Sequence, residues 1–128
     1  MTENHDIYDI YERTFEFACR VLKMHQALLG NRSVNRNAMT QLVSAASSIG
    51  SNMEEAKAGQ SKADFHAKLR IALKEARESY YWLRFIARSG AVRETRIAPL
   101  VQEANEIVAI LTTIAKKANP HNPAPSDS

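Results

Sequence analysis

Four segments of the chain repeat apolar residues at alternating spacings of three and four, the period of an amphipathic α-helix. Short polar stretches that contain glycine or asparagine separate these segments. The pattern predicts four helices, over residues 7–29, 36–58, 62–89 and 96–118. No segment shows the period of two that is typical of a half-buried strand, so we predict an all-α protein.

The predicted helices are joined by only a few residues, so consecutive helices must run antiparallel. We therefore predict an up-down-up-down four-helix bundle that occupies residues 1–118 as one domain. Residues 119–128 hold three of the four prolines and no apolar run, which predicts a disordered tail.

Local signals refine these helices. Gly30, Gly59 and Gly90 suit the left-handed residue that follows a helix, and Ser61 suits an N-cap. Pro99 is expected in a first turn, where its missing N–H costs little, so the fourth helix should begin near Arg96. Gly50, within the second helix, costs about 1 kcal/mol relative to alanine, which predicts a close contact with a neighbouring backbone.

The predicted core stripe of the first helix follows spacings of four and three, and further apolar residues widen it. The stripe is Ile7, Tyr11, Thr14, Ala18, Val21, His25 and Leu28, widened by Ile10, Phe15, Leu22 and Leu29. The apolar arc of the third helix is too wide for one bundle interior. Its outer flank of Ile71, Trp82 and Phe85 predicts a second buried surface, most simply an interface between identical subunits.

Composition adds few constraints. The chain of 128 residues has a net charge of +3 and one cysteine, Cys19, so no internal disulfide can form. The N-terminal residues lack the basic start and apolar run of a signal peptide, and no uncharged apolar run approaches the roughly 20 residues of a membrane span. We expect a cytoplasmic protein with no membrane contact.

The usual chemistry of helical bundles is not indicated. A di-iron centre requires Glu-x-x-His pairs, and the residues three positions before the four histidines are Thr2, Leu22, Ala63 and Ala118. A single cysteine removes thiolate metal sites, and no glycine-rich phosphate loop or Gly-x-Ser-x-Gly sequence occurs. We therefore predict no metal, no cofactor, no small-molecule substrate and no catalytic residue.

One enzymatic alternative stays open. Arg20 and His25 have the Arg-x4-His spacing used by some small helical ribonucleases, in which histidine transfers the proton and arginine binds the phosphate. The simpler interpretation places His25 in the core stripe and Arg20 in solvent.

A basic stripe is predicted along the third helix, opposite its core face. It consists of Arg70, Lys74, Arg77, Tyr81, Arg84 and Arg88. Basic side chains with an aromatic residue among them can follow phosphates and stack a base. The alternative is an ordinary solvated face.

Four polar residues are predicted near the seam between the second and third helices, namely Asn52, Glu55, Glu75 and Glu78. No nucleophile or metal partner accompanies them. We interpret them as a buried polar network that fixes helix register or subunit orientation, rather than as a catalytic group.

The segment from Ser48 to Ala56 reads Ser-Ile-Gly-Ser-Asn-Met-Glu-Glu-Ala. It resembles the Ser-Ile-Pro-x-Asn-Ile-x-Glu-Gly segment of a bacterial four-helix bundle family encoded in intervening sequences of 23S ribosomal RNA genes. The sequence departs from that form at Gly50, Met53 and Ala56. The resemblance is clearest over residues 40–88 and continues at Ser61, Phe65, Ile71, Ala72, Leu73, Glu78 and Leu83.

This resemblance implies a bundle that assembles as a homopentamer and a family without an established enzymatic activity. The chain is similar also to accessory proteins of diversity-generating retroelements, which form a basic pentameric barrel that binds reverse transcriptase and nucleic acid. We expect a non-enzymatic oligomeric scaffold whose basic stripe binds RNA or a nucleoprotein partner such as a reverse transcriptase. The alternatives are the ribonuclease above and an assembly module that binds only protein.

Overall fold

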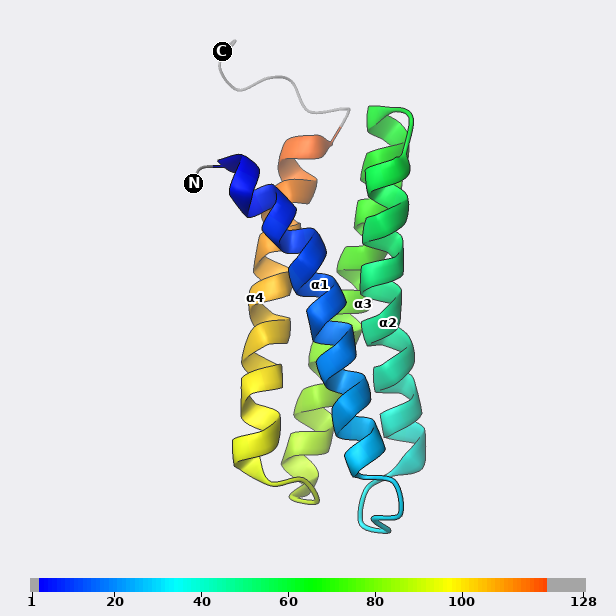
Figure 1. Cartoon of the computed structure of the whole chain (residues 1–128), viewed down its shortest axis with the longest axis vertical. Coiled ribbons are helices and arrows are strands. Elements are labelled where there is room, and N and C mark those ends of the chain that lie inside the picture. The colour runs from blue at the N-terminus through cyan, green and yellow to red at the C-terminus, as the bar shows by residue number, and fades with distance from the viewer. Residues whose placement is uncertain (1–2, 120–128) are drawn as a thin grey trace.

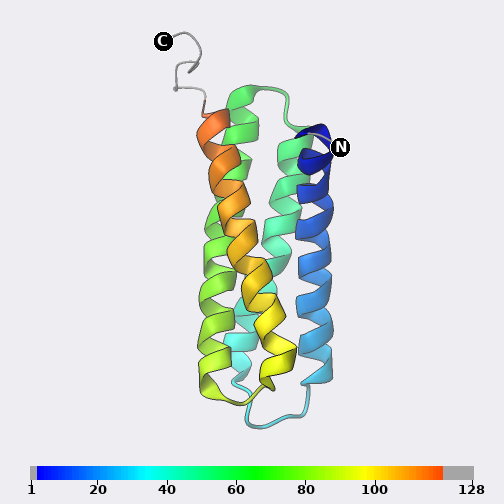
Figure 2. The ribbon, with the colours of Figure 1, turned by 90° about the vertical axis from the view of Figure 1, so that its left-hand side faces the viewer.

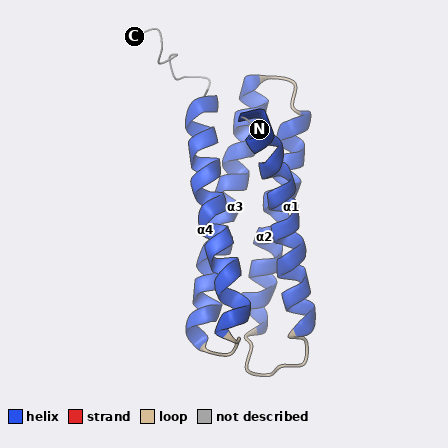
Figure 3. Ribbon diagram, turned by 60° about the vertical axis from the view of Figure 1, so that its left-hand side comes forward, coloured by secondary structure: helices blue, strands red, loops and turns tan. Residues whose placement is uncertain are grey.

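The computed structural model of the chain describes residues 3–119, with side chains from Ile10 onward. Every element in this range is an α-helix or a connection, and no strand occurs there (Figure 3). The predicted all-α fold is therefore confirmed. The helices are α1 (Glu3–Ala27), α2 (Arg36–Ala58), α3 (Lys62–Ser89) and α4 (Glu94–Ala118). The predicted disordered tail lies outside the described residues, apart from Asn119.

The four helices form an antiparallel bundle in which each packs beside the next and α1 also packs beside α4 (Figures 1 and 2). Helices α1 and α3 therefore lie diagonally, as do α2 and α4. The α2–α3 seam is the most extensive and the α1–α4 seam the least. The 28–35 and 90–93 connections lie together at one end of the bundle, which we call the loop end (Figure 1).

The bounds of α2 and α3 agree with the sequence prediction, and side-chain caps explain where both begin. The Asn35 Oδ1 accepts a hydrogen bond from the Ala38 N–H at 2.9 Å, and the Ser61 Oγ accepts one from the Asp64 N–H at 3.0 Å. Each cap satisfies one of the N–H groups that a helix start leaves without a partner.

The glycines that end the helices behave in two ways. Gly30 and Gly90 have φ angles of 90° and 76°, the left-handed conformation predicted for them. Gly59 instead has a φ of −63° and an extended backbone, so its predicted left-handed conformation is wrong. Its N–H still donates to the Ala56 carbonyl, and the extended conformation leads directly into the Ser61 cap.

Two helices start earlier than predicted. Helix α1 begins at Glu3 and ends at Ala27, and α4 begins at Glu94. Pro99 therefore lies in the second turn of α4 rather than the first. The helix accepts it at the loss of the one hydrogen bond that its N–H would have donated to the Thr95 carbonyl.

The core face of α1 differs from the predicted stripe. Phe17 and Met24 are fully buried, whereas Phe15 and Leu22 are 57% and 44% exposed. Helix α1 carries apolar residues on two faces, and the period alone does not say which face points inward. The observed inward stripe is Ile10, Thr14, Phe17, Val21 and Met24.

Gly50 of α2 marks the close approach of α1. A Cβ atom added to Gly50 would lie 3.6 Å from the Thr14 carbonyl oxygen and 3.8 Å from the Phe15 Cα. The expected backbone contact is present, although these distances are ordinary van der Waals contacts that leave room for a methyl group.

A cluster of charged side chains joins α1 to α4. Arg13 donates from Nε to Glu103 Oε2 at 2.9 Å and from Nη2 to Glu103 Oε1 at 2.8 Å. The same Nη2 donates to Glu106 Oε1 at 2.9 Å. The hydrogen bond to Glu103 is the main reason that the pKa of Arg13 lies above its ordinary value. Paired in-plane bonds of this kind also fix orientation.

Helix α4 is the one described helix long and apolar enough, by length and composition alone, to cross a membrane. A core helix of a soluble protein passes the same test. Its buried residues Ile97, Leu100, Ala104, Ile107 and Leu111 face the bundle interior.

Candidate nucleic-acid interface and self-association face

The basic stripe of α3 is exposed along its whole length. Between Arg70 and Arg88 the helix extends about 27 Å at a rise of 1.5 Å per residue, and all six predicted residues are exposed: Arg70, Lys74, Arg77, Tyr81, Arg84 and Arg88. A straight row of cations of this length can contact several phosphates of one strand.

Two contacts hold members of the stripe in place. The Lys74 Nζ lies 3.7 Å from Glu78 Oε2, a solvent-exposed pair one helical turn apart. The Arg84 guanidinium lies over the Tyr80 ring, 5.2 Å from its centroid. Because Tyr80 is half-buried and packs against the core, it offers a fixed support for the arginine.

Three aromatic rings gather on α3, one of them from Tyr81 of the basic stripe and two from residues beside it. Trp82 meets Tyr81 and Phe85 edge to face, with centroids 5.1 Å and 5.6 Å away. Phe85 is 51% exposed, and Ile71, more than three turns away along the helix, is 41% exposed. The structure thus brings Trp82 and Phe85 together and leaves Ile71 on the same flank, separate from them.

The flank of α3 that carries Ile71, Trp82 and Phe85 faces the α2 side of the bundle. The opposite flank of α3, with Tyr80 and Arg84, lines a groove with α4. On the far side of α2, the exposed Phe15 and Leu22 of α1 lie on the flank that approaches Gly50. Between the two apolar flanks lies an outer face of α2 made of small exposed residues: Thr40, Ser44, Ser47 and Ser51. We call this surface, from Phe15 and Leu22 across α2 to Ile71 and Phe85, the α2 face.

The predicted buried polar network is not formed within the chain. Glu55 is exposed, Glu78 is half-exposed and paired with Lys74, and the Asn52 amide donates to the Ser48 carbonyl of its own helix at 2.9 Å. The spacing of these residues suggested positions near the seam. Their side chains, however, point to solvent or bond within their own helix, and they do not bond to one another.

Among the side chains that the structure describes, the buried polar residues are instead Thr14 and Ser79, both fully buried. Thr14 donates to the Tyr11 carbonyl at 3.1 Å, and Ser79 donates to the Glu75 carbonyl at 2.9 Å. Each hydroxyl is thus satisfied inside its own helix, which explains how small polar residues fit a core stripe.

Glu75 is the acidic residue of α3 with a perturbed titration. Burial raises the pKa of its carboxyl above the ordinary value, and the Glu78 carboxylate raises it further, whereas Lys74 opposes the shift. The described residues contain no group of three or more His, Cys, Asp or Glu that could hold a metal ion, so Glu75 does not belong to such a cluster.

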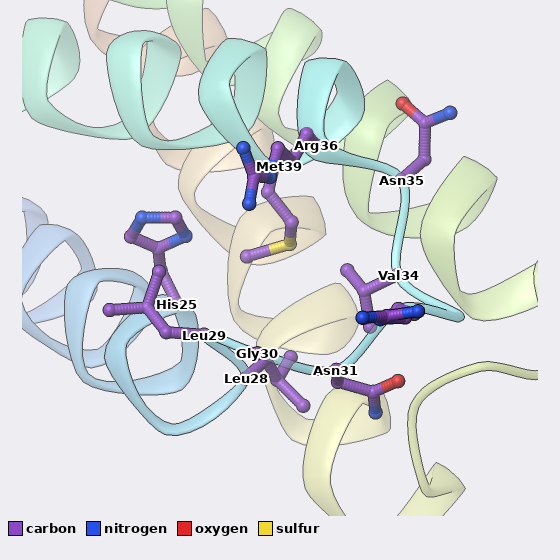
Figure 4. A pocket seen from close by; sticks show the side chains of 10 residues that line it. His25, Leu28, Leu29, Gly30, Asn31, Val34, Asn35, Arg36 and Met39 are labelled. Carbon is purple, nitrogen blue, oxygen red and sulfur yellow. The ribbon is translucent and has the colours of Figure 1, made fainter.

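The structure does not bring Arg20 and His25 to one site. Five positions along a helix correspond to about 140° of rotation, so the two side chains leave α1 on different sides. Arg20 is exposed, whereas His25 lines a cavity of about 610 Å³ between α1 and α2 (Figure 4). In that view His25 and Met39 approach the cavity from the two helices, and no carboxylate or hydroxyl is among its lining residues.

Sequence reasoning missed a concentration of arginines at the loop end. Arg32 lies in the connection after α1, and Arg36 is the first residue of α2. Arg93 lies in the connection between α3 and α4, and Arg96 lies in the first turn of α4. A signal was present in the sequence, because residues 17–53 and 79–93 contain no Asp or Glu at all. Only the fold shows that the middle of the first run and the end of the second lie together at the loop end.

A groove between α3 and α4 runs into this loop end. Its volume is about 810 Å³. Arg84, Arg88 and Arg93 line it together with one carboxylate, Glu94, and two amide side chains, Gln102 and Asn105. The groove lies on the flank of α3 opposite the α2 face, so the two surfaces do not overlap.

The comparisons with known proteins agree with this architecture. No curated protein matches the chain significantly. A solved structure from Bacteroides thetaiotaomicron, described as a protein with unknown function from the S23 ribosomal protein family, is 33% identical, with a TM-score of 0.77 over 84% of this chain and 98% of that one. The family model for the 23S rRNA-intervening sequence protein matches residues 7–113. The chain therefore belongs to the 23S rRNA-intervening sequence protein family.

Proposed function

We propose that this protein is a homo-oligomeric scaffold that binds RNA through the basic stripe of α3. The observation that carries the proposal is the division of α3 into three faces. One is buried in the bundle, one is apolar and exposed on the α2 face, and one carries an exposed basic row. A protomer with this helix can assemble through one surface and bind a polyanion through another.

The α2 face supports self-association. Phe15, Leu22, Ile71 and Phe85 are each between 41% and 57% exposed, and apolar side chains gathered on one side of a small domain mark an interaction surface. The small residues of α2 between them allow a neighbouring helix to approach closely. We take the oligomer to be a pentamer on the strength of the family resemblance, and the scaffold to act without catalysis.

The oligomer is tested by light scattering coupled to size-exclusion chromatography. The wild-type protein is expected to have about five times the mass of the 14.3 kDa chain. Ile71→Asp with Phe85→Asp should shift it toward the monomer, because two charges would be buried at the interface. Ser47→Asp, at an exposed position of α2, tests whether α2 takes part in the interface. Lys117→Asp on α4 serves as a control. A wild-type monomer at micromolar concentration would refute the assembly.

RNA binding is tested by fluorescence anisotropy with a labelled mixed-sequence single-stranded RNA over a range of salt concentrations. Charge reversal at Arg77 and Arg84 should weaken binding and reduce the salt-dependence slope by about 1.4, since each phosphate contact to a single strand contributes about 0.7. Reversal at Lys116 and Lys117 on α4 makes the same change in net charge away from the stripe. Equal effects of the two pairs would mean that only net charge matters.

The ribonuclease alternative is not supported by the position of Arg20 relative to His25. The protein-only assembly module remains as an outcome of the same experiments. It would be indicated by an oligomer that binds no RNA even at low salt.

A further inference from the structure

The groove between α3 and α4 is large enough to hold a ligand. Its volume of about 810 Å³ falls within the range typical of small-ligand pockets. Apolar residues form part of the lining, including Ala87 of α3 and Ile97 and Val101 of α4. The groove therefore combines an apolar surface with the charged and amide side chains of its rim.

The charge of the groove selects an anionic occupant. Arginines line it from α3 and from the 90–93 connection, with Glu94 as the one carboxylate in the lining. The acid-free runs 17–53 and 79–93 extend the same positive field across the loop end. Electrostatic focusing of this kind favours a polyanion that enters from the loop end.

One contact distinguishes a nucleotide from other anions. Arg84 lies over the Tyr80 ring, 5.2 Å from the centroid, and is an exposed residue. Unpaired bases stack on guanidinium planes and on aromatic rings. An arginine already supported by a half-buried ring loses little conformational freedom when a base is added to the stack.

The amide side chains of α4 supply the remaining chemistry. Gln102 donates to Glu106 Oε2 at 3.1 Å, and that bond holds its amide in place. Asn105, one turn closer to the middle of α4, is exposed. Amides both donate and accept hydrogen bonds, as recognition of an unpaired base edge requires.

We propose that the α3–α4 groove binds an unpaired segment of single-stranded RNA, with one base stacked on Arg84 and the adjoining phosphates bound by Arg88 and Arg93. This inference rests on the proposed function, because it names the part of the bundle that distinguishes single-stranded from double-stranded RNA. A duplex keeps its bases stacked inside the helix and cannot offer one to the groove.

The test compares two substitutions that keep the charge and remove the planar guanidinium. In the full-length protein, Arg84→Lys should weaken the binding of a labelled single-stranded RNA about fivefold or more. Arg70→Lys makes the same change on the same stripe, outside the groove, and should alter binding less than twofold. With double-stranded RNA of the same length the two variants should behave alike.

A second pair tests the phosphate contacts. Arg93→Glu should weaken single-stranded RNA binding more than Lys62→Glu, which changes the net charge equally at the opposite end of the bundle. Circular dichroism checks that each variant is folded.

The outcomes separate this inference from the proposed function. If wild-type protein binds RNA but Arg84→Lys matches Arg70→Lys, or Arg93→Glu matches Lys62→Glu, the groove is not the site and the stripe remains. Polyglutamate serves as a polyanion without bases or phosphates. If wild-type protein binds polyglutamate but no RNA, both proposals are wrong. A loss confined to Arg84→Lys and Arg93→Glu with single-stranded RNA supports the groove.

Discussion

Removing the Arg13 guanidinium should loosen the least extensive seam of the bundle. Arg13 makes two hydrogen bonds to Glu103, whose side chain is only 18% exposed, and a third to Glu106. Arg13→Met would leave the Glu103 carboxylate largely buried without its partner. Such a loss costs more than the pair itself contributes, because the remaining charge stays desolvated.

The magnitude follows from burial. Exposed ion pairs contribute about 0–1 kcal/mol, whereas hydrogen bonds to charged groups contribute about 1.5–3 kcal/mol. Arg13 is 30% exposed, so part of the gain is lost to solvent and to desolvation. We expect a coupling energy of about 1.5 kcal/mol between Arg13 and Glu103, and a loss of about 2–3 kcal/mol for Arg13→Met alone.

A double-mutant cycle with Arg13→Met and Glu103→Met measures this coupling. Urea unfolding followed by circular dichroism at one fixed protein concentration gives the free energies of unfolding. The matched control is the cycle of Lys74→Met and Glu78→Met. That pair lies 3.7 Å apart with side chains 69% and 46% exposed, and it should couple by about 0.3–0.5 kcal/mol. Equal coupling energies in the two cycles would refute the argument from burial.

Four further predictions concern stability and use the same urea assay. Gly50→Ala should stabilise the fold by about 0.5–1 kcal/mol, because the new methyl group meets Thr14 at ordinary contact distance. Gly90→Ala should destabilise it by about 1–2 kcal/mol, because φ there is 76°, and two changes of the same sign would contradict this reading. Asn35→Ala should cost about 1 kcal/mol through loss of the α2 cap, and an unchanged urea midpoint would show that the cap is dispensable. The pKa of Glu75 is raised in the folded state, mainly by burial, so the folded chain binds more protons than the unfolded one and the charged carboxylate destabilises the fold at neutral pH. Glu75→Gln should therefore raise the midpoint at pH 7, by an amount that shrinks as the pH falls through the folded-state pKa, and a gain that grows at low pH would refute the sign.

The helices were predictable from sequence because each has both a clear apolar period and a local stop signal. The bounds of α2 and α3 agree with the prediction at both ends, where Asn35, Ser61 and Gly90 act as caps. The start of α4 was misplaced because Pro99 was assigned to the first turn. A proline is tolerated in a second turn when packing further along the helix compensates for one lost hydrogen bond.

The orientation of α1 was not predictable from its period. Phe15 and Leu22 form one apolar stripe and Phe17 and Met24 another, and the choice depends on where α1 meets Gly50 and where Arg13 meets Glu103. These are contacts between segments far apart in the chain. The basic stripe lies within one helix, so it could be predicted from the sequence. The loop-end arginines and the α3–α4 groove join segments far apart in the chain, so they required the fold.

The start of α1 and the end of α4 lie at the same end of the bundle, opposite the loop end (Figure 1). Helices α1 and α4 are also neighbours. A short peptide linker could therefore join the start of α1 to the end of α4, and the chain could be reopened in the 59–61 connection without crossing another helix. Such a circular permutant would keep every helix and every seam, and it would make α3 the first helix to be synthesised. The four helices thus form a closed cycle, and a chain that begins at a different helix could form the same bundle.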